Sequence, residues 1–343
     1  MTAAPTTLAV PVPARRAPRQ VRWLLRLHRP TVLVWTAFVL LTGAALLWLG
    51  GPLTDASAAA WKAYNACDYS PRCAYDQDAI LRYKDVYTYT NVAVLVAPFL
   101  VAAWAGGALT GREMESGTAR LAWTQGVSPA RWLASRLTVP ALLVAASTGL
   151  LALLHRTAWT AADGRVDTAK PWYDYATFYA NGTLPVALAL AGLAVGALAG
   201  LLLRRSLAAL AVSVVALGGL WAAVHTALPH LWPSVTRTSD LGTGPAGTGI
   251  PTAEGVVTAG GDRVAAPCGS DTTYGCRAEL ADLDAVGYWR DFHPAAHHWP
   301  LHLVASGALL LLAAVLVLVS FRLLRHRTGP AARPAGGERT RTP

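Results

Sequence analysis

Four histidines near the C-terminal end of the chain are the residues whose type most directly suggests metal chemistry. His293, His297, His298 and His302 carry imidazole nitrogens, and the first two are four residues apart. Pro294 follows the first of them directly, and the cluster precedes a long apolar run, which is typical of interfacial histidines. We therefore predict no metal site. Because the sequence also has no Gly-x-Ser-x-Gly motif, we assign no catalytic residue.

The four cysteines have the chemistry to form disulfides or to hold zinc. Their spacings, C-x5-C and C-x7-C, are poor for zinc and favour the local disulfides Cys67–Cys73 and Cys268–Cys276, although four cysteines allow three pairings. Disulfides would place both segments in an oxidising compartment.

A nucleotide-binding motif is missing from the sequence. A phosphate-binding loop needs Gly-Lys followed by Ser or Thr, and the only lysines, Lys62, Lys84 and Lys170, follow Trp, Tyr and Ala. We therefore predict that the chain does not hydrolyse ATP alone, is not an enzyme, and has no cofactor-binding residue.

A charged, helix-prone segment, Gly111–Trp132, lies between two long apolar runs. Met114 and Leu121 are seven residues apart and give it a narrow apolar stripe. Gly126 is expected to end this helix, and Ser128 is a good N-cap for the next one. The pattern predicts a short amphipathic helix along the membrane surface, followed by a hinge. The alternative is an interfacial helix that anchors the loop and contacts no partner.

The elements around this segment read as membrane-spanning helices. Apolar residues make up 54% of the chain and charged residues only 14%. Six stretches without Asp, Glu, Lys or Arg have close to the roughly 20 residues that cross a bilayer as a helix. We predict an all-α membrane protein with spans at about residues 31–50, 90–110, 137–155, 181–203, 206–226 and 301–321.

Charge placement predicts the orientation of these spans. Four segments, residues 1–30, 111–136, 204–205 and 322–343, hold 18 Lys and Arg but only 3 Asp and Glu, whereas the other connections hold 11 and 16. The positive-inside rule therefore places the first set and both termini in the cytosol. The net charge of +10 is explained in this way and does not imply nucleic-acid binding.

The predicted organisation has a basic cytosolic tail at each end of one six-helix transmembrane domain. The tails are residues 1–30 and 322–343, and the domain is 31–321. Its external loops are residues 51–89, 156–180 and 227–299; the middle of the last is turn-rich, and no domain fold is assigned to it.

Two patterns predict packing. Gly192, Gly196 and Gly200 give the fourth span a flat groove for a second helix, either within the chain or across a dimer. Tyr83 and Tyr87 lie on one face of a helix leading into the second span, and we expect that face to form an aromatic belt at the headgroup level, with a ligand site as the alternative.

The charged segment and its flanks resemble the permease subunits of ABC-2-type transporters, in particular the multi-spanning permeases of actinobacteria. The residues that carry the resemblance are Glu115-Ser-Gly117-Thr118, Trp123-Thr124-Gln125 and Arg131-Trp132-Leu133. Weaker similarities are His28-Arg29 before the first span and Pro294–Pro300 before the last.

The resemblance implies a permease subunit of an ABC transporter in the bacterial plasma membrane, expected to export its substrate. It implies a second permease copy, as a homo- or heterodimer, and a separate ATP-binding subunit that carries ATP and Mg. The charged segment would then be a cytosolic coupling helix between spans 2 and 3. By analogy, the contact is formed or shaped by Glu113, Glu115, Gly117, Thr118, Arg120, Trp123 and Gln125.

Two other function classes are weighed against the permease. A non-transporting membrane anchor or sensor would use its disulfide-stapled external loops for binding and would need no ATP-binding partner. An integral-membrane enzyme would need a catalytic set, which the sequence does not provide.

Overall fold

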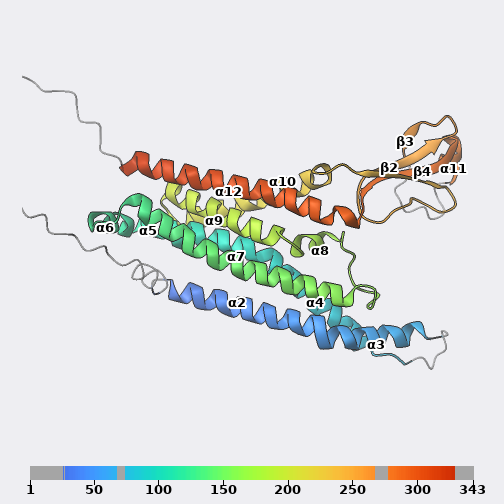
Figure 1. Cartoon of the computed structure of the whole chain (residues 1–343), viewed down its shortest axis with the longest axis horizontal. Helices are drawn as coiled ribbons and strands as arrows, with labels where there is room; N and C mark the ends of the chain where they lie inside the picture. Colours follow the sequence, from blue (N-terminus) through green and yellow to red (C-terminus); the bar gives the residue numbers. More distant parts are fainter. Residues whose placement is uncertain (1–25, 27, 68–73, 267–276, 329–343) are drawn as a thin grey trace, which may run out of the picture.

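The computed structural model describes residue 26 and residues 28–67, 74–266 and 277–328. Within these ranges six helices are long and apolar enough to cross a membrane, and they run alongside one another as a bundle (Figure 1). Their number and order agree with the six predicted spans. They are Arg29–Asn65, Gln77–Glu115, Pro129–Ala162, Leu184–Leu203, Ser206–His230 and Ala295–Thr328.

The first two of these helices each contain a π-helical turn. In the first, α2 (Arg29–Trp48) passes through η1 (Leu49–Leu53) into α3 (Thr54–Asn65), with a kink at Gly51, whose φ and ψ are −112° and −105°. In the second, α4 (Gln77–Trp104) passes through η2 (Ala105–Gly111) into α5 (Arg112–Glu115). A short helix, α6 (Thr118–Thr124), then leads to α7 (Pro129–Ala162).

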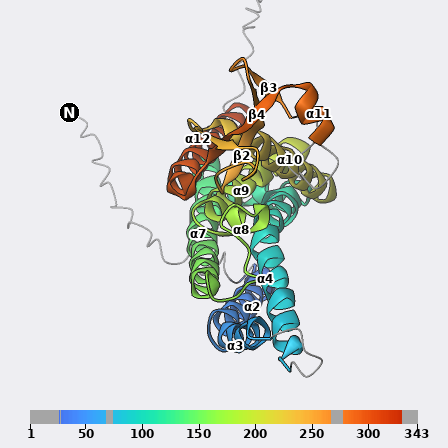
Figure 2. The same cartoon turned by 90° about the vertical axis from the view of Figure 1, so that its right-hand side faces the viewer.

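The second half of the bundle is built around one buried helix. After α8 (Tyr175–Ala180), α9 (Leu184–Leu203) contacts α4, η2, α7, α10 and α12. The chain continues through α10 (Ser206–Ala227) and η3 (Leu228–His230), and it ends with η4 (Ala295–His297) and α12 (His298–Thr328). Figure 2 shows α2 and α3 at one edge of the bundle and α10 and α12 at the other.

The glycine groove of α9 accepts α4 and η2 of the same chain. A Cβ atom on Gly196 would lie 2.7 Å from the carbonyl oxygen of Ala102 and 2.7 Å from the backbone nitrogen of Gly106. Gly192 faces the carbonyl oxygen of Pro98 in the same way. The lack of a side chain at these glycines therefore lets two backbones touch, which is how membrane helices pack without a hydrophobic driving force.

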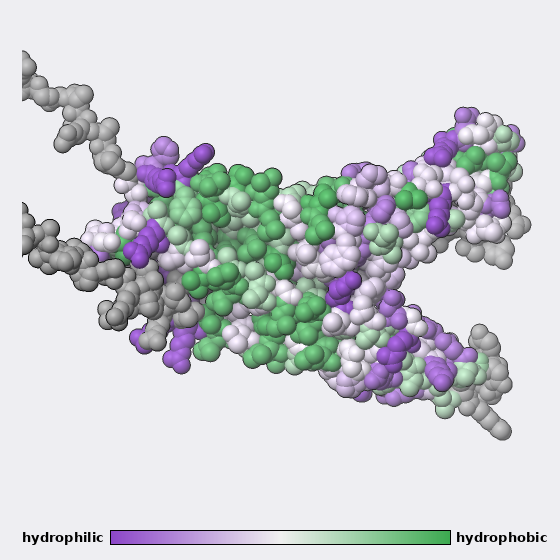
Figure 3. All heavy atoms as spheres, in the orientation of Figure 1, coloured by the Kyte–Doolittle hydropathy of each residue, from purple (hydrophilic) through white to green (hydrophobic). Residues whose placement is uncertain are grey.

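The bundle has two polar ends separated by an apolar band (Figure 3). At one end lie α5, α6, the start of α2 and the end of α12; we call this the α5/α6 end. At the other lie α3 and a small β-sheet; we call this the sheet end. Several helices extend past the predicted spans: α7 continues to Ala162, α12 continues to Thr328 and α4 already begins at Gln77.

The sheet corrects the prediction of an all-α protein. The 227–299 connection forms a four-stranded antiparallel sheet in the order β1-β4-β2-β3, together with the short helix α11 (Arg277–Asp282). A cross-strand ion pair of 2.7 Å joins Arg290 to Glu254. The strands are β1 (Val235–Asp240), β2 (Ile250–Thr258), β3 (Arg263–Ala265) and β4 (Ala285–His293).

The predicted aromatic belt is wrong for the helix that leads into the second span. Tyr83 and Tyr87 are 1% and 5% exposed, so they face the protein core instead of the headgroup layer. The hydroxyl of Tyr87 is hydrogen-bonded to Thr177 Oγ1 in α8 at 2.6 Å. Tyr87 therefore joins α4 to α8.

Candidate functional site

The charged segment folds as two short helices, not as the single surface helix predicted from its apolar stripe. Gly117 separates α5 from α6 with a φ of +74°, a left-handed conformation that disfavours any residue with a Cβ. Leu121 is consequently exposed on α6, while Met114 on α5 is half-buried. As the sequence predicts, Ser128 caps α7 by accepting a hydrogen bond from the backbone N–H of Arg131.

A buried ion pair fixes α5 to α7. Oε1 of Glu113 lies 2.6 Å from Nη2 of Arg136, and Trp132 Nε1 donates a hydrogen bond of 3.1 Å to Glu113 Oε2. Glu113 and Arg136 are 7% and 2% exposed. A carboxylate held by a guanidinium and an indole has a defined direction, so α5 has a fixed position on the start of α7.

His28 closes this cluster from the start of α2. Its Nε2 is 4.0 Å from Glu113 Oε1, and its ring packs edge-on against Trp104, with centroids 5.7 Å apart. Burial, together with the positive charges of Arg136 and Arg112, lowers the pKa of His28 to about 4. His28 is therefore neutral at neutral pH, and Arg136 is the cation that balances Glu113.

Glu115 links the same segment to the start of α10. Its Oε2 accepts a hydrogen bond of 2.9 Å from the backbone N–H of Ser206, the first residue of that helix. The hydrogen bond satisfies an N–H group that has no partner within the helix, and the negative charge complements the positive end of the helix dipole. Glu115 itself is exposed, so water weakens this interaction more than it weakens the buried pair of Glu113 and Arg136.

The predicted contact residues therefore divide into three groups. Glu113 faces the interior of the bundle, and Glu115 faces the start of α10. Thr118 and Gln125 are exposed at the two ends of α6, and Leu121 between them is 59% exposed; we call this exposed part of α6 the tip of the segment. The other three are Gly117, which forms the turn, and Arg120 and Trp123, which line a cavity.

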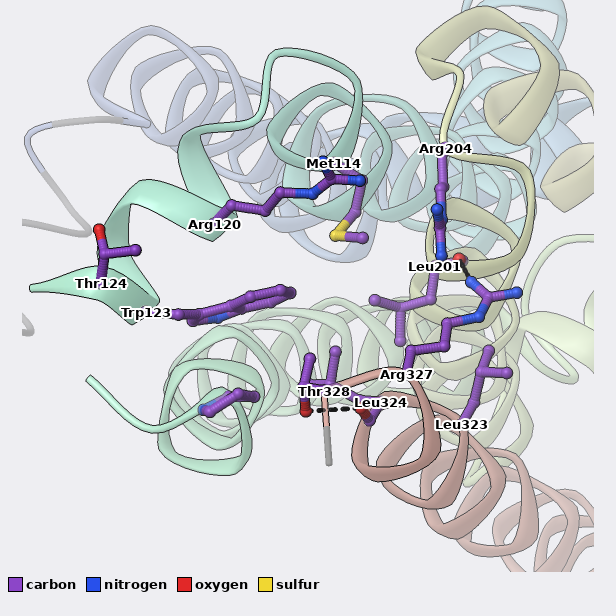
Figure 4. Close-up of a pocket in the computed structure, with 11 residues that line it drawn as sticks. Met114, Arg120, Trp123, Thr124, Leu201, Arg204, Leu323, Leu324, Arg327 and Thr328 are labelled. Carbon is purple, nitrogen blue, oxygen red and sulfur yellow. Dashed lines mark hydrogen bonds between the residues drawn. The ribbon is translucent and has the colours of Figure 1, made fainter. Parts of the chain in front are cut away.

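This cavity has a volume of about 620 Å³ and lies between the α5–α6 segment, the end of α9 and the last turns of α12 (Figure 4). Arg120 reaches into it from α6 toward Met114. Arg204 and Arg327 lie on its other side, where the guanidinium of Arg327 donates a hydrogen bond to the carbonyl oxygen of Leu201.

The four histidines singled out in the sequence form two pairs at the sheet end. Nδ1 of His293 is 3.1 Å from Nδ1 of His297, and the rings of His298 and His302 lie 4.5 Å apart. In the part of the chain that the structure describes, no three or more possible metal ligands come together.

Only one of the four predicted disulfide cysteines lies within the described residues. Cys67 is disulfide-bonded. Cys73, Cys268 and Cys276 lie outside the described ranges, so the pairing stays a prediction.

Sequence reasoning missed the partners that hold Glu113 and Glu115. In the sequence, Arg136 only adds to the cytosolic charge, and Trp132 only forms part of a motif. Ser206 only marks the start of a span. A signal was present: Glu113 and Arg136 flank the same connection, each next to a span, where an uncompensated charge is costly.

Comparison with known proteins gives one match. Residues 19–229 match the family described as ABC-2 membrane transporter related, which includes five of the six helices and the whole α5–α6 segment. The matched region ends within η3, before the sheet and α12. Comparisons with curated proteins and with solved structures found no match. With more than half of its residues matched and six apolar helices of spanning length, the chain is a multi-pass plasma-membrane protein that belongs to the ABC-2 membrane transporter related family.

Proposed function

We propose that this chain is the permease subunit of an ABC transporter and that its α5–α6 segment docks on a separate ATP-binding subunit in the cytosol. In this proposal the α5/α6 end and both termini face the cytosol, and the sheet end faces outward. The charge asymmetry between the two sets of connections supports this orientation.

The observation that carries the proposal is the way the segment is attached. Glu113 ties α5 to α7 through Arg136 and Trp132, and Glu115 ties it to the start of α10 through Ser206. The segment also continues directly from the second spanning helix. A push on its tip therefore acts on three spanning helices at once, which is what coupling to a moving partner needs.

The tip itself offers a surface for such a partner. Leu121 is exposed between polar neighbours that include Thr124 and Gln125. A partner that covered this leucine would remove its apolar surface from water, which favours association. ATP and Mg would be held by the partner, which supplies the hydrolysis that this chain lacks.

A second permease copy completes the proposed transporter, and export is the direction that the resemblance implies. Support for a path for uncharged or amphipathic cargo comes from a second cavity, of about 430 Å³, between α2, α4 and α7. Apart from His28, no titratable side chain lines it within the described residues.

Replacing Leu121 with Asp should weaken binding of the separate ATP-binding subunit. Burying a leucine side chain contributes about 1.5–3 kcal/mol, and aspartate would place an unpaired charge in the interface, so we expect at least about a tenfold loss of affinity in co-purification and binding measurements. ATP-dependent export by membrane vesicles should fall with it.

Val286→Asp is the matched control for Leu121→Asp. Val286 is 56% exposed on β4 at the opposite end, so the same kind of change should leave association untouched. If both variants bind the partner normally, α6 is not the docking element, and a membrane anchor or sensor becomes the better account.

A further inference from the structure

The cavity at the α5/α6 end gathers positive charge without a counter-charge. Arg120, Arg204 and Arg327 come from α6, from the turn between α9 and α10, and from the last turn of α12. No Asp or Glu lines the cavity, and none among the described residues forms an ion pair with these three. Three cations at one cavity repel one another, so an anion bound among them would stabilise the arrangement.

The backbone holds two of these arginines in place. Arg204 ends α9 in the left-handed region with a φ of 54°, a conformation that residues with a Cβ rarely adopt. Arg327 is oriented by its hydrogen bond to the carbonyl oxygen of Leu201. The positions of these two arginines are therefore set by the contact between the end of α9 and the end of α12.

Apart from Thr124 and Thr328, the rest of the lining is apolar, and the cavity lies at the depth of the lipid headgroups. α9 has 20 residues, or about 30 Å, which is the thickness of the hydrocarbon core, so its last turn reaches the membrane surface. Arg204 follows that turn directly. The apolar lining consists of Met114, Trp123, Pro129, Leu201, Leu323 and Leu324.

We propose that this cavity binds the phosphate group of an anionic phospholipid, with the upper part of an acyl chain against its apolar lining. Basic pockets between spanning helices at the membrane surface have the chemistry for such headgroups. An acidic protein surface would neutralise the charges of the arginines, but it would not cover the apolar surface of the leucines of α9 and α12. The site needs only the membrane-spanning fold and does not depend on the proposed ATP-binding partner.

The test uses the full chain, purified in dodecyl maltoside and freed of lipid. It is titrated with dioleoylphosphatidylglycerol, and in parallel with dioleoylphosphatidylcholine and with inorganic phosphate. Bound lipid is counted by native mass spectrometry, and the midpoint of thermal unfolding is followed. We expect phosphatidylglycerol to bind and raise the midpoint, while phosphatidylcholine and inorganic phosphate at the same concentration do not.

The triple variant Arg120→Gln, Arg204→Gln and Arg327→Gln should need about ten times more phosphatidylglycerol, or more, for the same effect. The matched control, Arg131→Gln, Arg322→Gln and Arg325→Gln, removes the same charge from the same end but outside the cavity lining. It should change the requirement by no more than about twofold.

Three results would overturn the proposal. Equal losses in the two triple variants would mean general surface attraction. An equal effect of inorganic phosphate would mean a site for a free anion. Unchanged lipid binding in the cavity variant, with lost association of the ATP-binding subunit, would assign the arginines to an acidic protein surface.

Discussion

Replacing Arg136 with Met should lower the stability of the bundle by about 3–5 kcal/mol, because the change leaves the carboxylate of Glu113 buried without its cation. The variant keeps most of the side-chain volume, so the loss of charge is the main effect. Thermal unfolding of the purified chain in detergent measures it as a fall in the midpoint. Because α5 is attached through this pair, binding of the ATP-binding subunit should fall as well.

The double variant Glu113→Gln with Arg136→Met should recover much of the lost stability. The glutamine amide oxygen can still accept the hydrogen bond from Trp132, and no charge remains buried. Arg131→Met on the exposed side of α7 should change stability by less than about 0.5 kcal/mol. A double variant as unstable as Arg136→Met alone would show that the pair does not hold α5 on α7.

Placing a single methyl group on Gly196 should force α9 and η2 apart. The added Cβ would lie 2.6 Å from the Cβ of Ala105 and 2.7 Å from two backbone atoms of the facing helix, which cannot rotate away. Overpacking of this kind costs about 3 kcal/mol, so Gly196→Ala should unfold at a clearly lower temperature. Gly196→Leu should yield no folded protein.

Gly219→Ala in α10 and Gly307→Ala in α12 are the matched controls. A Cβ at either position meets no atom within 4 Å. Alanine favours a helix over glycine by about 1 kcal/mol, so these variants should be unchanged or slightly more stable. A loss equal to that of Gly196→Ala would mean that glycine itself, and not the close approach of α9 to η2, is what matters.

The spanning helices were predictable because the bilayer imposes both their length and their lack of charge. Outside the bilayer that constraint ends. The predicted span boundaries therefore missed the extension of α7 to Ala162, whereas the tyrosine spacing did indicate the helical part of α4 before Thr90. The sheet was missed because a glycine-rich stretch, which is typical of turns, separates β1 from β2, and because β1 and β2 both pair with β4, which is distant in the sequence.

The candidate site shows a different limit. Local rules found the hinge after α6 and the cap of α7, because both depend on neighbouring residues. The pairing of Glu113 with Arg136 depends on how α5 folds back onto α7, which no periodicity encodes. Gly117 interrupts the single helix predicted for this segment, and the Ser-Gly-Thr sequence around it is typical of a helix end followed by a new start.

The central claim is that the tip of α6 contacts an ATP-binding subunit in the cytosol, and site-specific photocrosslinking tests it most directly. A photoreactive amino acid is placed at Leu121, or at Val286 on the sheet as the reference position, in cells that make both subunits. Docking through α6 predicts a crosslink to the ATP-binding subunit from position 121 and none from position 286. A crosslink from position 286 but not from position 121 would contradict both the docking surface and the orientation.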